Sequence, residues 1–279
     1  MTAETIAQFA GEALLKELSA TPKPGLVDRR NNGAHTDMDY AVFLASKEAL
    51  VPFFRDFAEF GQTHAFSEEK EIFSEGRPIG VKAEKAMLAA TNGVNTHKGA
   101  IFSLGLASTA CGVLLGRNQI PDAEKVCRIV MKMTEGLCEK DFSSAKETHG
   151  EKAFARYAVT GARGEAETGY RLIRREALPF LLSSVERGMD ENEALVRTLL
   201  LILSETTDTN LIHRGGIGEA EWVSREAKKR IGAPMEQIEA FDDALIEKNL
   251  SPGGCADLLA LTYFFFRLEK EKKVCYNEK

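Results

Sequence analysis

Residues 97–117 read H-K-G-A-I-F-S-L-G-L-A-S-T-A-C-G-V-L-L-G-R. Two residues that can carry a positive charge open the stretch, and an apolar run rich in small side chains follows. Small residues keep a helix slim, so neighbouring helices can pack closely against it. We therefore expect a helix at the centre of a bundle, with these small residues in its body: Gly99, Ala100, Ser103, Gly105, Ala107, Ser108, Ala110 and Gly112.

Helical periodicity recurs along the rest of the chain. Alternating β-branched runs bounded by turn pairs are missing, and no Pro/Gly/Ser linker divides the sequence. We therefore expect one all-α domain over residues 1–279, a helical bundle of about ten or eleven helices with its active site built from inter-helix loops. The expected helices are roughly 3–19, 38–61, 81–91, 97–117, 122–139, 151–158, 164–186, 190–205, 219–230, 236–248 and 252–271.

Composition places the chain among soluble globular proteins. The 279 residues are 44% apolar and 28% charged, and the net charge of −6 argues against nucleic acid as the main partner. Five cysteines without a C-x-x-C pair indicate reduced thiols. The N-terminus lacks a signal-peptide core, and the most apolar run, L-L-L-I-L at 199–203, is too short to span a membrane. We expect a cytoplasmic protein without membrane contact.

Polar, glycine-containing segments separate the expected helices. Four of the five histidines lie in them, and only His64 does not. Because helix ends in a bundle commonly meet at one mouth, these loops predict a single polar site. The segments are 21–39, 92–100, 148–151 together with 160–170, 207–216, and 251–260.

The segment T-P-K-P-G-L-V-D-R-R-N-N-G-A-H-T-D-M-D (21–39) is a long loop stiffened by two prolines. Helix capping does not account for its many charged and amide side chains, which predict binding of a polar ligand. The side chains concerned are Lys23, Asp28, Arg29, Arg30, Asn31 and Asn32.

Asp37 and Asp39 follow at the start of the next expected helix. Two interpretations of this pair stay open. Thr36 with Asp39 three residues later resembles a capping box, and acidic residues favour a helix N-terminus. Carboxylates are also ligands for Mg²⁺, directly or through water.

In N-G-V-N-T-H-K-G-A (92–100), Asn95 or Thr96 could cap the helix that follows. The free N–H groups and the positive dipole end of a helix form an anion site, to which Lys98 adds a full charge. The alternative is a solvated first turn in which His97 and Lys98 have no ligand. The pattern G-x-x-x-x-G-K-[ST] is absent, so this is not a P-loop.

Two other segments carry carboxylates. In 160–170, Arg163 and Glu167 have the spacing of an ordinary ion pair, and Glu165 lies on a different helix face. In 251–260, Ser251 resembles a helix cap, and Asp257 is either satisfied in the core or a site carboxylate. Spacing alone does not decide between these interpretations.

In T-D-T-N-L-I-H-R-G-G (207–216), Asp208, His213 and Arg214 crowd an expected helix end sealed by Gly215 and Gly216. A glycine C-cap with a compensating cation accounts for Arg214 and the glycines. It leaves Asp208 and His213 unexplained, so both are candidate catalytic groups.

Taken in order, these segments resemble those of the triphosphoribosyl-dephospho-CoA synthase family, which makes the prosthetic-group precursor of citrate lyase and malonate decarboxylase. The stretch R-P-I-G-V-K-A-E-K-A-M (77–87) also matches and adds Glu84. The resemblance runs from about residue 20 to 262, and Cys255 departs from it where a serine is expected. It implies an all-α fold, dependence on Mg²⁺, and transfer of the triphosphoribosyl group of ATP to the 2′-hydroxyl of 3′-dephospho-CoA with release of adenine. The product would pass to an acyl-carrier-protein transferase.

That reaction needs groups for the triphosphate, a metal, and a base, and an oxocarbenium-like transition state favours a nearby carboxylate. Spacing does not say which carboxylate is the base, nor whether the protein is a homo-oligomer. The hypothesised metal ligands are Asp37, Asp39 and Glu84. The hypothesised triphosphate ligands are Lys23, Arg29, Arg30, Asn31, Asn32, Lys98, Arg163 and Arg214. The catalytic candidates are the carboxylates Asp28, Glu165 and Asp208 and the titratable His97 and His213.

Two other classes of function stay open at this point. One is a Mg²⁺-dependent ADP-ribosyl or nucleoside hydrolase, because T-T-D-T-N (206–210) resembles the Asp/Thr loops of such sites. The other is a non-catalytic nucleotide or coenzyme A sensor, against which the density of carboxylates beside cations argues.

Overall fold

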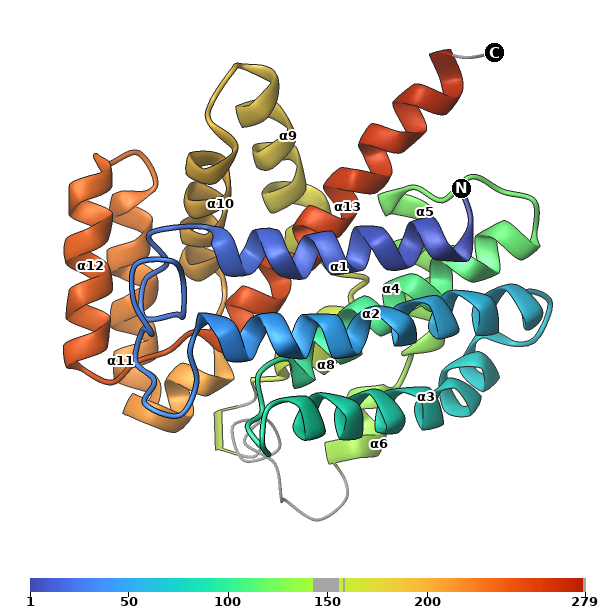
Figure 1. Ribbon diagram of the computed structural model, residues 1–279, viewed down its shortest axis with the longest axis horizontal. Coiled ribbons are helices and arrows are strands. Elements are labelled where there is room, and N and C mark those ends of the chain that lie inside the picture. The colour runs from blue at the N-terminus through green and yellow to red at the C-terminus, as the bar shows by residue number, and fades with distance from the viewer. Residues whose placement is uncertain (143–155, 158, 278–279) are drawn as a thin grey trace.

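The computed structural model describes residues 1–142, 156–157 and 159–277 (Figure 1). In these ranges there are twelve α-helices, eleven of them with seven or more residues, one π-helical turn and no strand, which confirms the all-α prediction. The elements are α1 (Ala3–Ser19), α2 (Tyr40–Thr63), α3 (Glu69–Ala90), α4 (Lys98–Gly116), α5 (Ala123–Met133), α6 (Leu137–Phe142), α8 (Gly161–Glu167), η1 (Ile173–Ala177), α9 (Leu178–Glu186), α10 (Glu191–Glu205), α11 (Thr209–Arg230), α12 (Met235–Glu247) and α13 (Gly253–Asn277).

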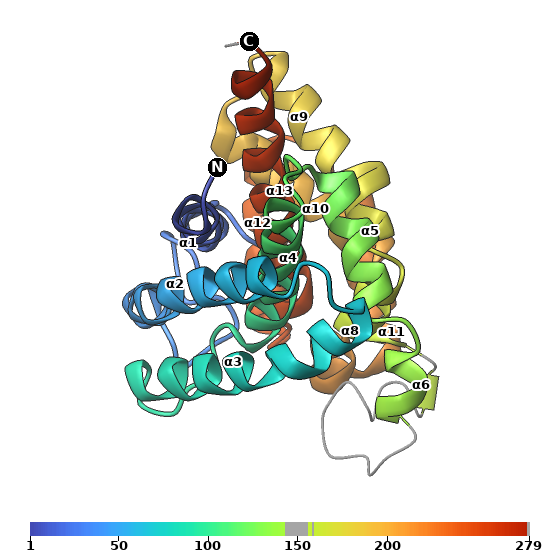
Figure 2. The ribbon, with the colours of Figure 1, turned by 90° about the vertical axis from the view of Figure 1, so that its right-hand side faces the viewer.

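Helix α4 lies in the interior, with α1, α2 and α3 on one side and α5 and α8 on the other (Figure 2). Its glycines allow backbone-on-backbone packing against α2. A Cβ atom on Gly112 would lie 1.9 Å from the carbonyl oxygen of Ala58, and one on Gly61 would lie 2.0 Å from that of Thr109. Since real Cβ atoms do not approach so closely, a larger residue at either position would force the helices apart. The predicted slim central helix is confirmed.

Helix α4 is also the one helix in the described part of the chain that is long and apolar enough to cross a membrane. However, 78% of this stretch is buried inside the protein, as in the core helix of a soluble protein. Its apolar character therefore reflects its neighbours in the bundle.

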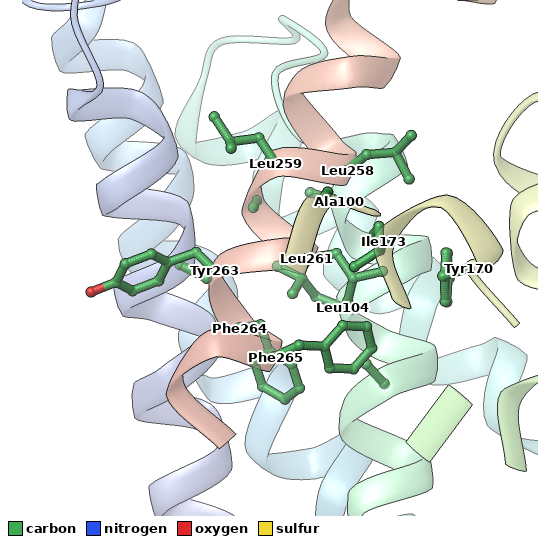
Figure 3. Packing of buried hydrophobic residues seen from close by; sticks show 14 of the residues in the cluster. Ala100, Leu104, Tyr170, Ile173, Leu258, Leu259, Leu261, Tyr263, Phe264 and Phe265 are labelled. Atoms are coloured by element: carbon green, nitrogen blue, oxygen red, sulfur yellow. The ribbon is translucent and has the colours of Figure 1, made fainter. Parts of the chain in front are cut away.

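The second core helix is α13, which packs against α1, α4 and α10. Figure 3 shows its apolar side chains, among them Leu258, Leu261, Phe264 and Phe265, meeting Leu104 of α4. Each of these is buried, and burying such a side chain contributes about 1.5–3 kcal/mol. Together the two helices hold the loops that carry the polar segments.

Two predicted helix boundaries were wrong, one for a reason of packing and one because of a left-handed glycine. Helix α3 begins at Glu69, well before the predicted 81–91, although its sequence contains Gly76 and Pro78. Gly76 packs under the ring of Phe60 on α2, so tertiary contact overrides its low helix propensity. The predicted helix 122–139 is divided into α5 and α6, because Gly136 takes a positive φ of 78°.

Two further boundaries differ at left-handed residues. The predicted helix 164–186 is interrupted after α8, where Gly169 and Tyr170 have φ of 62° and 52°. The predicted helix 219–230 begins at Thr209 and contains a kink at Gly216, with φ of 81°. The predicted helix 151–158 falls almost entirely outside the described residues.

Candidate active site

The helix ends surround a cavity of about 730 Å³, a size typical of small-molecule sites. All five predicted polar segments contribute to its lining, which confirms the prediction of one polar site; the portion 148–151 lies outside the described residues. Nine of the predicted site residues line it: Lys23, Asp37, His97, Lys98, Arg163, Glu165, Asp208, His213 and Arg214. Seven do not: Asp28, Arg29, Arg30, Asn31, Asn32, Asp39 and Glu84.

Asp28 is buried and organises the 21–39 loop. One oxygen, Oδ2, accepts the backbone N–H of Lys23 at 2.8 Å, and Oδ1 accepts those of Arg30 and Asn31 at 2.7 and 3.1 Å. These bonds direct both oxygens at backbone groups rather than at the cavity. The geometry is therefore that of a loop-organising group and gives no support to a role as base.

The next residues of this loop attach it to α12. The guanidinium of Arg30 donates to Asp242 at 2.7 Å and to Asp243 at 2.9 Å, and the amide of Asn31 donates to Asp242 at 2.8 Å. Arg29 and Asn32 are exposed. The charged and amide residues 28–32, which the sequence pattern emphasised, therefore do not face the cavity; other residues of the loop do.

Lys23 is the buried cation of the loop, and it forms an ion pair with Glu17 of α1. Both residues line the cavity. Burial raises the pKa of Glu17, and Lys23 opposes that rise. Because Glu17 already balances its charge, Lys23 is a weaker attractor for a bound anion than the sequence suggested.

The N-terminus of α4 is occupied by the protein's own groups. The N-cap residue is His97, whose side chain makes no cap hydrogen bond, while Asn95 Oδ1, two residues earlier, accepts the N–H of Lys98 at 3.2 Å. The carboxylate of Asp257 interacts with the N–H of Ala100, and its Oδ2 would lie 1.9 Å from a Cβ on Gly99. The expectation of a free backbone cradle for the triphosphate at 97–100 is therefore wrong, because a carboxyl group takes that place.

Burial and the nearby acids Glu17 and Asp208 raise the pKa of Asp257 well above its ordinary value, and the Ala100 N–H only partly offsets this. The folded protein thus binds a proton here that the unfolded chain has already released above about pH 4. Wild-type stability should therefore fall relative to Asp257→Asn as the pH rises toward the folded-state pKa. Urea unfolding at pH 5, 6, 7 and 8 measures this, and a wild-type-to-variant difference independent of pH would contradict it.

His97 is buried, and its Nδ1 lies 2.6 Å from Ser46 Oγ. Thr96 Oγ1 donates to the same Ser46 oxygen at 2.7 Å, so we assign the hydroxyl hydrogen of Ser46 to Nδ1 and the ring hydrogen to Nε2. Burial, with the charge of Lys23, lowers the pKa of His97 to about 3. His97 is therefore neutral, and its expected role as a group that titrates near neutral pH is wrong.

The three predicted metal ligands have different roles in the structure. Asp37 lines the cavity, whereas Asp39 caps α2 by accepting the N–H of Val42 at 2.9 Å. Glu84 accepts a hydrogen bond from Lys98 Nζ at 2.6 Å. Among the described residues, no three His, Cys, Asp or Glu side chains form a metal site. Because Mg²⁺ usually binds to one or two carboxylates plus substrate phosphates, Asp37 still fits a metal that arrives with ATP.

On α8, Glu165 and Glu167 face different surroundings, as the sequence predicted. Glu167 Oε1 accepts the N–H of Cys138 at 3.1 Å, away from the cavity lining. Glu165 lines the cavity, its Oε2 is buried without a hydrogen-bond partner in the described part of the chain, and burial raises its pKa. Arg163 lines the same cavity.

The sequence predicted that Asp208 lies at the end of a helix. This prediction is wrong, because Asp208 stands at the start of a helix. Its Oδ1 accepts the N–H groups of Asn210 and Leu211 at 2.7 and 3.2 Å, which caps α11. Its Oδ2 accepts the N–H of Cys255 at 2.8 Å, in the first turn of α13. Asp208 is buried, so a single carboxylate joins two helix N-termini beneath the cavity.

Arg214 is positioned by carbonyl and amide oxygens. Its Nη1 donates to Ala34 O and to Asn249 Oδ1, both at 2.8 Å, and its Nη2 lies 3.3 Å from His35 Nδ1. No carboxylate takes part in these three contacts, although the charge of Asp37 interacts with the guanidinium. His213 is exposed at the rim of the same cavity.

The predicted site residues left out several polar residues of the lining, among them Glu17, Tyr170, Thr206 and Asp257. Asp257 was left undecided because the contact with Gly99 joins segments far apart in the sequence. Tyr170 ends the motif T-G-Y, whose glycine signalled a left-handed turn that could have drawn attention to the residue after it.

The fold and the site define an all-helical protein whose described cavity combines cations with buried carboxyl groups, a lining suited to a small phosphorylated ligand. The family model described as ATP:dephospho-CoA triphosphoribosyl transferase matches residues 3–275. The chain therefore belongs to the ATP:dephospho-CoA triphosphoribosyl transferase family, and it is a transferase.

Similar proteins agree with this assignment. The 2-(5″-triphosphoribosyl)-3′-dephosphocoenzyme-A synthase of Pectobacterium atrosepticum is 43% identical over 270 residues, which cover 95% of this chain and 90% of that protein. The enzyme of the same name from Klebsiella pneumoniae is 40% identical over 274 residues, or 95% and 91% of the two chains. A crystal structure from Archaeoglobus fulgidus, assigned to triphosphoribosyl-dephospho-CoA synthase, covers 81% of this chain and 98% of its own at a TM-score of 0.52. Its 21% identity supports the fold alone.

Proposed function

We propose that the cavity binds ATP and 3′-dephospho-CoA together and transfers the 5-triphosphoribosyl group to the 2′-hydroxyl of dephospho-CoA, releasing adenine. The observation that carries this proposal is that cations and the carboxyl group of Glu165, whose buried Oε2 has no hydrogen-bond partner among the described residues, line one cavity. If it is right, adenine appears only when both substrates are present. Adenine from ATP alone would favour a hydrolase, and binding without adenine would favour a sensor.

The triphosphate stays on the product, so its site has to bind it without activating it. About four negative charges need partners, and arginine is well suited to phosphate. Arg163, Arg214 and Lys98 provide cations along the cavity, and Asp37 would hold a Mg²⁺ ion that neutralises part of the triphosphate charge.

The base in this proposal is Glu165. It takes the proton of the 2′-hydroxyl as that oxygen attacks C1 of the ATP ribose. Asp28 and Asp208, the other two candidates, direct their oxygens at backbone N–H groups, whereas Glu165 Oε2 is available to a ligand. Its negative charge would also stabilise an oxocarbenium-like ribose bound beside it.

Asp257 is the group best placed to donate a proton to the departing adenine. Its raised pKa favours the protonated form of its carboxyl group, whereas the lowered pKa of His97, about 3, favours the neutral imidazole. It lines the cavity from the side of α13, and a carboxylic acid there can both donate a hydrogen bond and transfer the proton.

Replacing Lys98 with alanine should raise the KM for ATP about ten-fold or more, because a charge-assisted contact to the triphosphate is lost. The substitution would also leave Glu84, which forms an ion pair with Lys98, without its cation. The neighbouring exposed Lys85, outside the cavity lining, provides the matched control Lys85→Ala, which should leave the KM unchanged. A normal KM in the Lys98 variant would remove Lys98 from the phosphate site.

The single-domain organisation, the cytoplasmic location, a homo-oligomeric state and transfer of the product to an acyl-carrier-protein transferase stay predictions. The relatives' names support the proposed substrates, since each names the triphosphoribosylated dephospho-coenzyme A that its enzyme makes. Neither citrate lyase nor malonate decarboxylase is favoured, because both use that precursor.

A further inference from the structure

Several buried polar atoms in the cavity wall lack a hydrogen-bond partner among the residues that the structure describes. Buried polar atoms are nearly always paired, so those that are not call for an explanation. A cluster of them around one cavity indicates a ligand that completes their bonds. The atoms are His97 Nε2, Glu165 Oε2, Tyr170 Oη and Thr206 Oγ1.

Tyr170 is the most unusual of these residues. Its side chain is fully buried, and its backbone has a φ of 52°, in the left-handed region that bulky residues rarely adopt. Such conformations cost free energy and gather at functional sites. Tyr170 belongs to the hydrophobic core, but core packing alone does not explain a strained tyrosine whose hydroxyl has no partner among the described residues.

The backbone couples Tyr170 to Glu165. The N–H of Tyr170 donates to the carbonyl of Glu165 at 2.7 Å, and that of Gly169 donates to Ala166 at 2.9 Å, the two bonds of a Schellman motif that ends α8. Gly169 cannot be replaced easily, because a Cβ there would lie 2.9 Å from the carbonyl oxygen of Cys127. The helix end therefore fixes the backbone of Glu165 and Tyr170 in relation to each other, and the two side chains are close enough to interact electrostatically.

A second interaction, from a residue that follows the Schellman motif, also holds this turn. The Nε of Arg174 donates to the carbonyl of Gly169 at 2.7 Å, and the π-helical turn of η1 follows directly. Such turns are frequent at functional sites. The strained turn is thus held from both sides, which keeps the hydroxyl in a fixed place.

The pair offers complementary chemistry. The phenol of Tyr170 is a donor, and Glu165 is an acceptor whose Oε2 is unpaired. A ribose hydroxyl is a donor and an acceptor at once, so one hydroxyl can accept from the first and donate to the second. We propose that Tyr170 donates a hydrogen bond to the 2′-hydroxyl of 3′-dephospho-CoA while that hydroxyl donates to Glu165. Tyr170 is then a substrate-binding residue that orients the attacking oxygen, an inference that rests on the proposed function.

The test is Tyr170→Phe, which keeps the ring and removes only the hydroxyl. Calorimetric binding of dephospho-CoA to the variant should weaken about five- to ten-fold, the loss of one hydrogen bond, while ATP binding stays unchanged. A 2′-deoxy analogue of dephospho-CoA should bind wild type and variant equally, because the partner oxygen is gone.

The matched control is Tyr263→Phe. Tyr263 is equally buried in α13, but its hydroxyl bonds Glu12 of α1 at 3.0 Å on the other side of the packed cluster from Tyr170 (Figure 3). That variant should bind both substrates normally. Dephospho-CoA binding by Tyr170→Phe within two-fold of wild type, or a loss confined to ATP, would overturn the inference. If wild type releases adenine from the two substrates in the same preparation, the proposed function stands in either case.

Discussion

Replacing Glu165 with glutamine should lower kcat by about 10²–10⁴-fold, the contribution usual for a general base. The change keeps the size of the side chain but removes the lone pair and charge that take the proton of the 2′-hydroxyl. Because burial raises the pKa of Glu165, wild-type kcat/KM should also rise with pH through a pKa above the ordinary 4.5, and this limb should disappear in the variant. Adenine release at saturating substrate measures kcat, and adenine release at substrate well below KM, followed across a pH series, measures the change in kcat/KM.

The control for this substitution lies on the same helix. Glu167→Gln keeps an oxygen for the N–H of Cys138 and does not touch the cavity lining, so its kcat should stay near that of wild type. A Glu165→Gln enzyme that retains a third or more of wild-type kcat would rule out Glu165 as the base, since general base catalysis is worth about 100-fold at the least.

Replacing Asp208 with alanine should destabilise the protein by about 2–4 kcal/mol, the largest effect on stability that the site predicts. One buried carboxylate accepts three backbone N–H groups from two helix N-termini, and alanine leaves all three unpaired. The midpoint of urea unfolding measures the loss.

Asp190 provides a matched comparison, because its Oδ1 accepts the second and third N–H groups of α10 in the same way but at an exposed position. Asp190→Ala should therefore cost only about 1 kcal/mol. Equal losses in the two variants would show that Asp208 does no more than cap a single helix.

The features of the fold that depend on residue type alone were predicted correctly from the sequence. Small residues along 97–117 predict a central helix because packing density depends on side-chain size, and the contact of Gly112 with the α2 backbone bears this out. The start of α3 was missed because Gly76 and Pro78 oppose a helix locally, and only the neighbouring Phe60 reverses that preference. The gathering of the polar loops was predictable, since helix ends in a bundle meet.

The roles within the site were less accessible. Asp28, Glu165 and Asp208 are all carboxylates in polar segments, and they differ only in the backbone N–H groups that they face. Most of those groups lie within five residues of their carboxylate, so the difference depends on the local loop geometry, whereas the Cys255 N–H that Asp208 also accepts comes from a distant segment. Asp257 is likewise remote in sequence from its partner, because its carboxyl group contacts Gly99 at the start of α4.

The most direct test of the central claim follows the γ-phosphate of ATP. The protein is incubated with dephospho-CoA and ATP labelled at that phosphate, and the products are separated and identified by mass spectrometry. The account predicts one labelled triphosphoribosyl-dephospho-CoA for each adenine released, with no labelled phosphate or pyrophosphate set free. Release of the label as phosphate, or of adenine without a labelled coenzyme product, would contradict it.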